Sequence, residues 1–286
     1  MTQGTPPEDK FVTVNGLRLH YLDWGGNADR VLLFAHGQGG NGHNFDHIAQ
    51  ELRDEFRILA LDQRGHGDSD HTREGYSVKL FAADLAAFAE AVDIIPYDYC
   101  GASLGARNAI PYAGDHSDHL RHVVLLDYGP EMSTESARSQ IGRIGTRPLG
   151  WRSKEDYIAY LRERDPRVSE EQLRRNAEYS LRLNYANRYV LKSDPDLFWI
   201  NGSFGVAEVP YLWEQWAKIR CPILELKGAL SNYLSPEILE RMKRLQPTMR
   251  FAEVPDSGHP ITSHNPAFLI EQLRQFLNEP ASQGVE

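Results

Sequence analysis

The hydrophobic positions of the chain form two patterns: short apolar runs, and longer segments with apolar residues at helical spacing. Some of the short runs, Val31–Ala35 above all, are continuously apolar, which is typical of strands buried on both faces of a parallel sheet. Asn15-Gly16 joins the first two runs and predicts a tight hairpin turn. The predicted strands are Phe11–Val14, Leu17–Leu22, Val31–Ala35, Phe56–Leu61, Tyr97–Cys100, Arg121–Leu126, Pro222–Leu226 and Arg250–Val254.

The segments with helical spacing alternate with these runs in the first third of the chain and follow the last of them near its end. The clearest are Phe45–Phe56, Val78–Val92 and Pro266–Leu277. Strands that alternate with helices form a sheet that is covered by helices on both faces. The pattern therefore predicts an α/β fold with a mainly parallel sheet.

The region between the strands that end at Leu126 and begin at Pro222 has a different pattern. It contains helical segments at Lys154–Arg164, Ser169–Leu183 and Val209–Ile219, and no run that predicts a strand. We interpret it as a helical cap over the carboxyl edge of the sheet, and a few of its aromatic residues are expected to line a pocket there. The predicted division is a core of residues 1–130 and 220–286 and a cap of residues 131–219.

Composition and charge narrow the choice of partner. The formal net charge of −9 argues against nucleic acid or an anionic membrane as a partner, so a small-molecule substrate is expected. No run approaches 18 consecutive apolar residues, and the first ten residues contain no apolar signal region. A soluble, cytoplasmic protein is therefore expected, as a monomer or a homodimer.

The pentapeptide Gly101-Ala102-Ser103-Leu104-Gly105 lies between a predicted strand and a segment that reads as the start of a helix. In that context the G-x-S-x-G pattern is typical of a nucleophile elbow, a tight turn that holds the serine in strained backbone geometry and exposes its Oγ. The glycines remove Cβ atoms that would collide with the neighbouring strand and helix. The pattern predicts Ser103 as a catalytic nucleophile.

A serine hydroxyl needs a base to act as a nucleophile at neutral pH. Among the eleven histidines, His259 follows a late predicted strand and is expected at the sheet edge that presents Ser103. The glycine-bearing loop His36–Gly40 follows another strand, and its backbone suits an oxyanion hole. We predict that the N–H groups of Gln38 and Leu104 hold the oxyanion.

Other polar residues are assigned structural roles. His36 is expected to shape its glycine-rich turn, and Asp62 and Asp68 to brace the turn at Arg64 through charge-assisted hydrogen bonds. The histidines expected to be solvated or to cap helices are His66, His116, His119 and His264.

No cofactor or metal is expected. The chain has no Walker-type lysine and no His-Glu-x-x-His or paired-cysteine spacing. Cys100 and Cys221 each lie beside an apolar run and are predicted to be buried free thiols.

Four motifs in the same order along the chain resemble those of the α/β-hydrolase superfamily, over about residues 11–278. They are the His36–Gly40 loop, the segment Asp62–Ser69, the Ser103 elbow and Gly258-His259. The resemblance implies an eight-stranded, mostly parallel sheet with a helical lid and a triad of serine, acid and histidine. The superfamily includes esterases, lactonases, amidases, C–C bond hydrolases and cofactor-free oxygenases, so the fold alone does not give the substrate.

The acid of the triad is where the chain departs from the superfamily pattern. Similar proteins most often carry an aspartate at the position of Asn232, and an amide cannot stabilise a histidine cation as a carboxylate does. Asp127, at the end of the strand Arg121–Leu126, is the first alternative, because some members take the acid from there. The second is that Asn232 orients His259 as the asparagine of papain-like enzymes does. The third is a hydrolase weakened by Asn232.

These assignments favour a serine hydrolase that cleaves a small-to-medium, hydrophobic carboxylic ester or lactone through an acyl-enzyme. Two alternatives keep the fold. In one, His259 acts as a base in C–C cleavage or cofactor-free oxygenation. In the other, the protein is a ligand receptor with attenuated catalysis, which the presence of Asn232 would explain.

Overall fold

The structure is a computed structural model, and it describes residues 5–26, 29–197 and 206–281. The described residues form an eight-stranded sheet in the order β1-β2-β4-β3-β5-β6-β9-β10, in which β1 and β2 are antiparallel to their neighbours and the other pairs are parallel. The predicted fold class is confirmed. The strands are β1 (Glu8–Val14), β2 (Leu17–Asp23), β3 (Val31–Ala35), β4 (Arg57–Leu61), β5 (Tyr97–Ala102), β6 (Leu120–Leu126), β9 (Ile223–Gly228) and β10 (Arg250–Val254).

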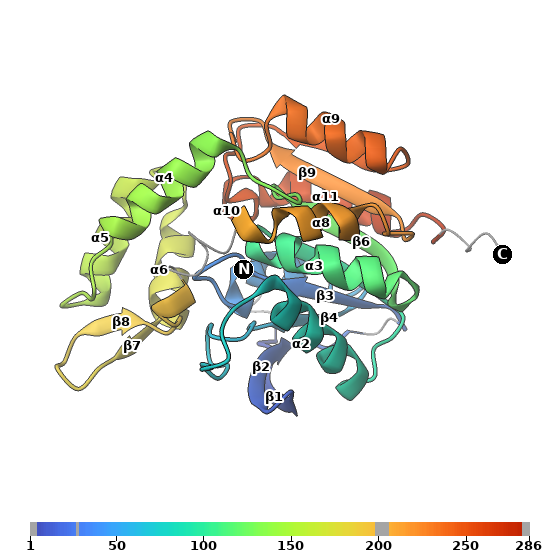
Figure 1. Cartoon of the computed structure of the whole chain (residues 1–286). Helices are drawn as coiled ribbons and strands as arrows, with labels where there is room; N and C mark the ends of the chain where they lie inside the picture. The colour runs from blue at the N-terminus through green and yellow to red at the C-terminus, as the bar shows by residue number, and fades with distance from the viewer. Residues whose placement is uncertain (1–4, 27–28, 198–205, 282–286) are drawn as a thin grey trace.

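Helices cover both faces of this sheet (Figure 1). One face packs against α1 (Asp46–Leu52) and α11 (Pro266–Leu277), the other against α2 (Val78–Ala91), α3 (Leu104–Asp115), α8 (Val209–Trp216) and α9 (Pro236–Leu245). Alternate side chains of β3 pack on opposite faces of the sheet. Leu33 packs on the face covered by α2, α3, α8 and α9, and its neighbours Leu32 and Phe34 pack on the face covered by α1 and α11. The sequence of β3 is continuously apolar because both faces of this central strand are buried.

Short elements and turns complete the body. The predicted hairpin turn is present, with positive φ at both Asn15 and Gly16 as a type I′ turn requires. Cys100 and Cys221 are buried and free, as expected. Within the described ranges every helix is too short or too polar to span a lipid bilayer. The remaining short helices are η1 (Gly42–Phe45), η2 (Ser117–His119) and α10 (Ile261–His264).

Residues 131–197 form a separate lobe beside the sheet (Figure 1). It contains α4 (Thr134–Gly145), α5 (Lys154–Arg164), α6 (Glu170–Tyr179) and a small hairpin of β7 (Leu181–Leu183) and β8 (Tyr189–Leu191). Its own small core is built from Trp151, Tyr157, Ile158, Leu173, Ala177 and Leu181. Arg175 of α6 forms an ion pair with the buried Asp46 and holds this lobe to the body. From here on, the cap means the described residues 131–197.

Two features of the predicted cap differ in the structure. The cap does contain strands, because the chain leaves the helical path at Ser180 and pairs β7 with β8. These strands are three residues long and only Leu181 of their residues is buried, so they leave no apolar run in the sequence. Helix α8, placed in the predicted cap range of 131–219, packs on α3, and Leu212 and Trp216 belong to the main core of the body.

Candidate active site

Ser103 lies in a strained turn between β5 and α3. Its backbone has φ 50° and ψ −106°, a conformation that costs an ordinary residue free energy. A Cβ on Gly101 would lie 2.5 Å from the carbonyl carbon of Gly105, and one on Gly105 would lie 2.2 Å from the carbonyl oxygen of Ala35. As expected from the sequence, the turn at Ser103 is strained and leaves no room for a side chain at either Gly101 or Gly105.

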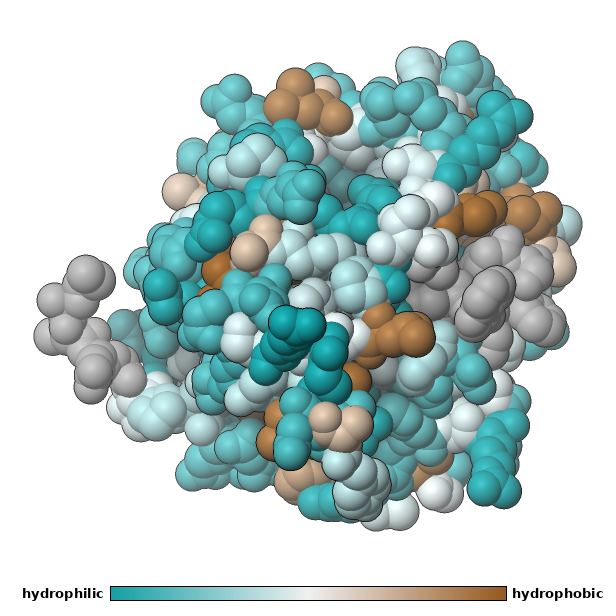
Figure 2. Space-filling view, turned by 90° about the vertical axis from the view of Figure 1, so that its left-hand side faces the viewer, coloured by the Kyte–Doolittle hydropathy of each residue, from teal (hydrophilic) through white to brown (hydrophobic). Residues whose placement is uncertain are grey.

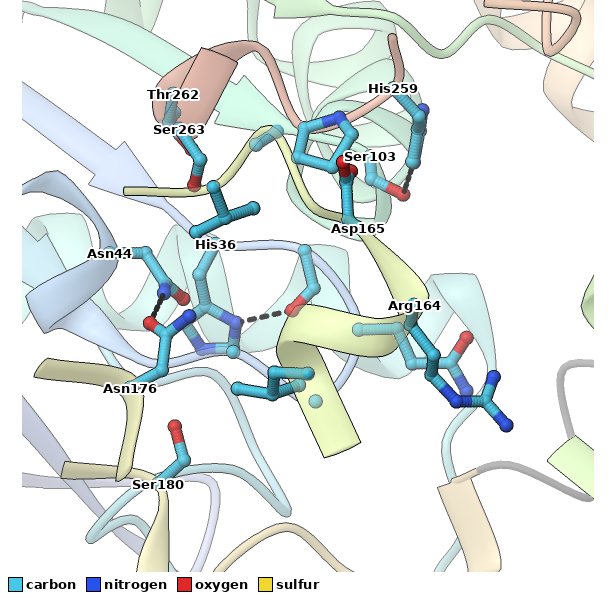
Figure 3. A pocket seen from close by; sticks show the side chains of 18 of the residues that line it. His36, Asn44, Ser103, Arg164, Asp165, Asn176, Ser180, His259, Thr262 and Ser263 are labelled. Carbon is cyan, nitrogen blue, oxygen red and sulfur yellow. Dashed lines mark hydrogen bonds between the residues drawn. The ribbon is translucent and has the colours of Figure 1, made fainter. Parts of the chain in front are cut away.

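His259 connects Ser103 to a carboxylate. Its Nε2 lies 2.9 Å from the Ser103 Oγ, a contact drawn in Figure 3, and its Nδ1 lies 2.7 Å from the Asp127 Oδ2. The carboxylate accepts a hydrogen bond from the Nδ1–H group, so the Nε2 is free to accept a hydrogen bond from the Ser103 hydroxyl. The three residues come from the chain after β5, β6 and β10, at one edge of the sheet.

Asp127 and His259 are held in place by neighbours from the loop after β9. The Asp127 carboxylate is fully buried and accepts hydrogen bonds from the Ser231 hydroxyl and, at 3.3 Å, from the Gly228 N–H. The Tyr233 ring stacks on the imidazole with its centroid 3.5 Å away and the planes 7° apart. These contacts fix the orientation of the imidazole ring.

Asn232 is not brought to the histidine. Its exposed side chain donates to Glu135 of α4 at 3.4 Å, and its carbonyl oxygen accepts from the Ser133 hydroxyl. The loop turns so that the residues on either side, Ser231 and Tyr233, are buried against the Asp127–His259 pair. Sequence reasoning missed both, although their positions next to the suspected acid would have been the signal.

The predicted oxyanion groups lie beside Ser103. Leu104 is the first residue of α3, so its N–H points out of a helix N-terminus, and Gln38 follows β3 in the adjacent loop. A Cβ on Gly37 would lie 3.3 Å from the Ser103 Cβ, which shows how closely the loop approaches. In the described part of the chain, neither the Leu104 N–H nor the Gln38 N–H forms a hydrogen bond.

His36 is buried beneath this loop. Its Nε2 accepts from the Gln63 N–H at 3.1 Å, so its Nδ1 carries the proton and donates to the Gly37 carbonyl at 2.8 Å. Burial lowers the pKa of His36 and keeps the ring neutral. These bonds hold the turn, in agreement with the role expected for His36.

The turn at Arg64 is braced differently from the prediction. Arg64 forms a bidentate ion pair with Asp84 of α2, at 2.5 and 2.7 Å, and not with Asp62 or Asp68. Asp68 instead pairs with Lys192 of the cap. The fork of a guanidinium favours a carboxylate that meets both nitrogens, and the sequence gives no sign that a distant helix supplies it.

His20, Asp62 and Asp68 lie close enough together to hold a metal ion. The carboxylate of Asp62, however, already accepts hydrogen bonds from the His20 ring at 2.7 Å and from the N–H groups of Gly42 and Asp68 at 2.6 and 2.9 Å. This group supports the loops next to the active site.

Two histidines expected to be solvated or capping are buried instead. His66 is fully buried, and burial lowers its pKa to about 3. The His264 Nδ1 accepts from the Gly258 N–H at 3.0 Å, and its Nε2 contacts Asp165 of the cap at 2.8 Å. His264 thus connects the cap to the loop that carries His259.

A cavity of about 440 Å³ lies between the sheet edge and the cap, a size suited to a small molecule. Ser103 and His259 line it from the body (Figure 3). Phe45 and Tyr233 also line it. From the cap it is lined by Tyr157, Tyr160, Arg143, Arg147 and Arg164, among others. Aromatic rings of the cap therefore line the cavity as expected, but positively charged side chains stand beside them.

The outer face of the cap is mostly hydrophilic (Figure 2). Its exposed hydrophobic residues are scattered in separate small groups, among them Ile141, Leu149, Leu183 and Tyr185. Scattered hydrophobic residues are normal for a protein surface and do not mark a binding patch.

The fold and the arrangement of Ser103, His259 and Asp127 match a known class of protein. A family model described as the alpha/beta hydrolase fold matches residues 30–266, and the chain belongs to this family.

Several proteins of this class are similar over most of their length. A 2-(acetamidomethylene)succinate hydrolase of Mesorhizobium japonicum is 27% identical over 248 residues, which cover 87% of this chain and 88% of the relative. An esterase of Mycobacterium tuberculosis is 28% identical over 264 residues, covering 90% and 85%. A crystal structure of E-2-(acetamidomethylene)succinate hydrolase superposes with a TM-score of 0.88 at 24% identity, over 96% of this chain and 100% of that one, which shows the fold. These similarities support a hydrolase of the superfamily.

Proposed function

We propose that the protein is a serine hydrolase that cleaves a small-to-medium carboxylic ester or lactone through an acyl-enzyme. The observation that carries the proposal is the continuous chain of contacts from the Ser103 Oγ through His259 to Asp127. The residues occur in the order serine, aspartate, histidine, which is the order of α/β-hydrolase triads. The names of the relatives from M. japonicum and M. tuberculosis, a hydrolase and an esterase, support the same reaction class.

In the proposed mechanism, Ser103 attacks the substrate carbonyl as the His259 Nε2 takes its proton. Asp127 accepts the hydrogen bond from Nδ1 and stabilises the imidazolium that forms. The N–H groups of Leu104 and Gln38 donate to the oxyanion. His259 then protonates the leaving alcohol, and a water deprotonated by the same nitrogen hydrolyses the acyl-Ser103 intermediate.

The geometry weakens the reasons for the two alternatives. Both rested on the idea that Asn232 had replaced the acid of the triad. Asp127 lies at hydrogen-bonding distance from His259 while the Asn232 side chain contacts Glu135, so no acid is missing from the arrangement. A binding pocket or a base acting alone would also not need the strained conformation of Ser103.

The proposal is tested by trapping the intermediate. The protein is mixed with 4-nitrophenyl acetate, and nitrophenol release is followed on the millisecond scale. We expect a burst equal to the enzyme concentration and, after acid quenching, acetyl on the peptide that contains Ser103, with neither in Ser103→Ala.

Turnover by Ser103→Ala at a rate near that of the unmodified protein would overturn the acyl-enzyme and favour His259 as a base. Absence of hydrolysis by the folded protein, across a panel of aryl and alkyl esters, would overturn the hydrolase proposal.

A further inference from the structure

The cap presents a group of cations to the cavity that contains Ser103. Arg143 comes from the end of α4, Arg147 from the chain that follows, and Arg164 from the last residue of α5. Figure 3 shows Arg164 among the side chains that line the cavity with Ser103. We call these three residues the arginine cluster. Guanidinium groups remain charged at any pH a protein tolerates.

The charges of Arg143 and Arg164 are not balanced by a carboxylate among the described residues of the cavity wall. Among the described lining residues Asp165 carries the one carboxylate, and it already contacts His264 and Arg167. Arg143 donates to the Tyr233 hydroxyl at 3.2 Å and Arg164 to the Thr146 hydroxyl at 3.1 Å, and in the described part of the chain neither forms an ion pair. The cap side of the cavity that contains Ser103 therefore carries the unpaired positive charges of Arg143 and Arg164.

Placing these cations together has a cost. Burial, together with the positive charge of Arg164, lowers the pKa of Arg147, so the site disfavours the charge that it holds. The Arg164 guanidinium lies over the Tyr160 ring, 4.6 Å from its centroid, which fixes its position at the wall. An arrangement of like charges in a partly enclosed cavity is stabilised when an anion binds between them.

The positive charge at the cavity contrasts with the negative net charge of the whole chain. The chain carries a formal net charge of −9, which repels anionic molecules from most of its surface. A cavity with the opposite sign concentrates anions at the nucleophile. A purely hydrophobic ester would gain nothing from these charges.

We propose that the substrate carries a carboxylate besides the ester group, and that the arginine cluster binds this carboxylate while Ser103 attacks the ester carbonyl. The substrate class is thus a half-ester of a small dicarboxylic acid or a similar acid-bearing ester. This inference rests on the proposed hydrolase function and extends it to specificity.

The test compares two esters of the same shape and different charge. Monomethyl glutarate carries a carboxylate, and the monomethyl ester of glutaramic acid carries a neutral carboxamide in its place. The kcat/KM ratio of the two is measured for the unmodified protein and for Arg143→Gln, Arg147→Gln and Arg164→Gln. The matched control is Arg174→Gln, a cap arginine that pairs with Glu170 outside the cavity.

We expect the unmodified protein to prefer the carboxylate ester by about 10- to 100-fold, the range for a hydrogen bond to a charged group. Each substitution in the arginine cluster should reduce this preference, mainly through KM, and Arg174→Gln should leave it unchanged. Equal rates for both esters in the unmodified protein, or an unchanged ratio in all three variants of the cluster, would overturn the inference.

A binding experiment separates this inference from the proposed function. Glutarate is titrated calorimetrically into Ser103→Ala, which cannot turn over, and into the same protein with Arg164→Gln or Arg174→Gln added. If Arg164→Gln weakens glutarate binding about tenfold or more and Arg174→Gln does not, the result supports the anion site even if no ester is hydrolysed. Absence of glutarate binding at millimolar concentration, with the thermal unfolding of each variant intact, overturns it.

Discussion

The sheet edge and the cap contribute to the same cavity in different ways. The groups from the sheet edge are buried and tightly constrained: Asp127 is fully buried, and Ser103 is held in a strained turn with no room for a Cβ on either flanking glycine. The cap has a small core of its own, and Arg143 and Arg164 reach the cavity from its exposed surface. The comparison suggests that the body determines the reaction and the cap determines which molecule undergoes it.

Substitutions in the body should therefore act mainly on kcat, and substitutions in the cap mainly on KM. Replacing the body residue His259 by alanine removes the proposed base, and we expect kcat to fall by on the order of 10⁶, the loss known for the catalytic histidine of a serine protease. Replacing the cap residue Arg164 by glutamine should act mainly on KM. Steady-state kinetics with a carboxylate-bearing ester measures both, and a fall in kcat of similar size in the two variants would contradict the division.

Backbone constraints should differ as well. Gly105→Ala places a Cβ 2.2 Å from a carbonyl oxygen of β3, so we expect a loss of at least about 3 kcal/mol in the free energy of unfolding or failure to fold. Gly142 of α4 has open space around its Cα, and Gly142→Ala should stabilise the protein by up to about 1 kcal/mol through helix propensity. Urea unfolding of the two variants checks this contrast, and similar losses in both would contradict it.

The burial of His66 in the body should also make the free energy of unfolding depend on pH. The pKa of His66 is about 3 in the folded protein and near 6.5 when unfolded, so the unfolded state binds more protons between these values. The part of the free energy of unfolding that depends on a neutral His66 is therefore fully present above pH 6.5 and is lost as the pH falls towards 3.

This pH effect is checked by chemical unfolding at pH 7 and pH 5. We expect His66→Asn to reduce the loss of stability over that range by about 2 kcal/mol, since one pKa unit corresponds to about 1.4 kcal/mol. The exposed His47 provides the control, and His47→Asn should leave the pH dependence as it is. If the unmodified protein, His66→Asn and His47→Asn all lost the same free energy of unfolding between pH 7 and pH 5, the prediction would be contradicted.

The smallest expected effect concerns Glu225 on β9. Burial, together with the charge of Asp127, raises the pKa of Glu225 well above its usual value. An acid with a raised pKa in the folded state destabilises the fold once the pH exceeds its unfolded pKa, near 4.5. Glu225→Gln should raise stability on the order of 1 kcal/mol at pH 7 and have little effect at pH 4. A gain of equal size at both values would show that charge is not the cause.

The body was largely predictable from sequence for a physical reason. Its central strands are buried on both faces and appear as strongly apolar segments, and the Ser103 elbow needs glycines at fixed positions. Contacts between distant segments were not predictable. The pairing of Arg64 with Asp84 and the contact of Ser231 with Asp127 depend on how distant segments meet in space. The β7–β8 hairpin has strands of only three residues, too short to leave a pattern.

The choice of acid shows the same limit. The sequence offered both Asp127 and Asn232, since each follows a strand that ends at the same sheet edge. The three-dimensional path of the loop after β9 separates them, because it buries Ser231 and Tyr233 and leaves Asn232 exposed.

The most direct test of the account compares Asp127→Asn with Asn232→Asp in the hydrolysis of a short aryl ester. If Asp127 is the acid of the triad, Asp127→Asn should lower kcat by about 10⁴, the loss known for this exchange in a serine protease. Asn232→Asp, at an exposed position away from His259, should change kcat less than about threefold. A gain of several hundred-fold in Asn232→Asp, with little loss in Asp127→Asn, would place the acid at residue 232 and contradict the account.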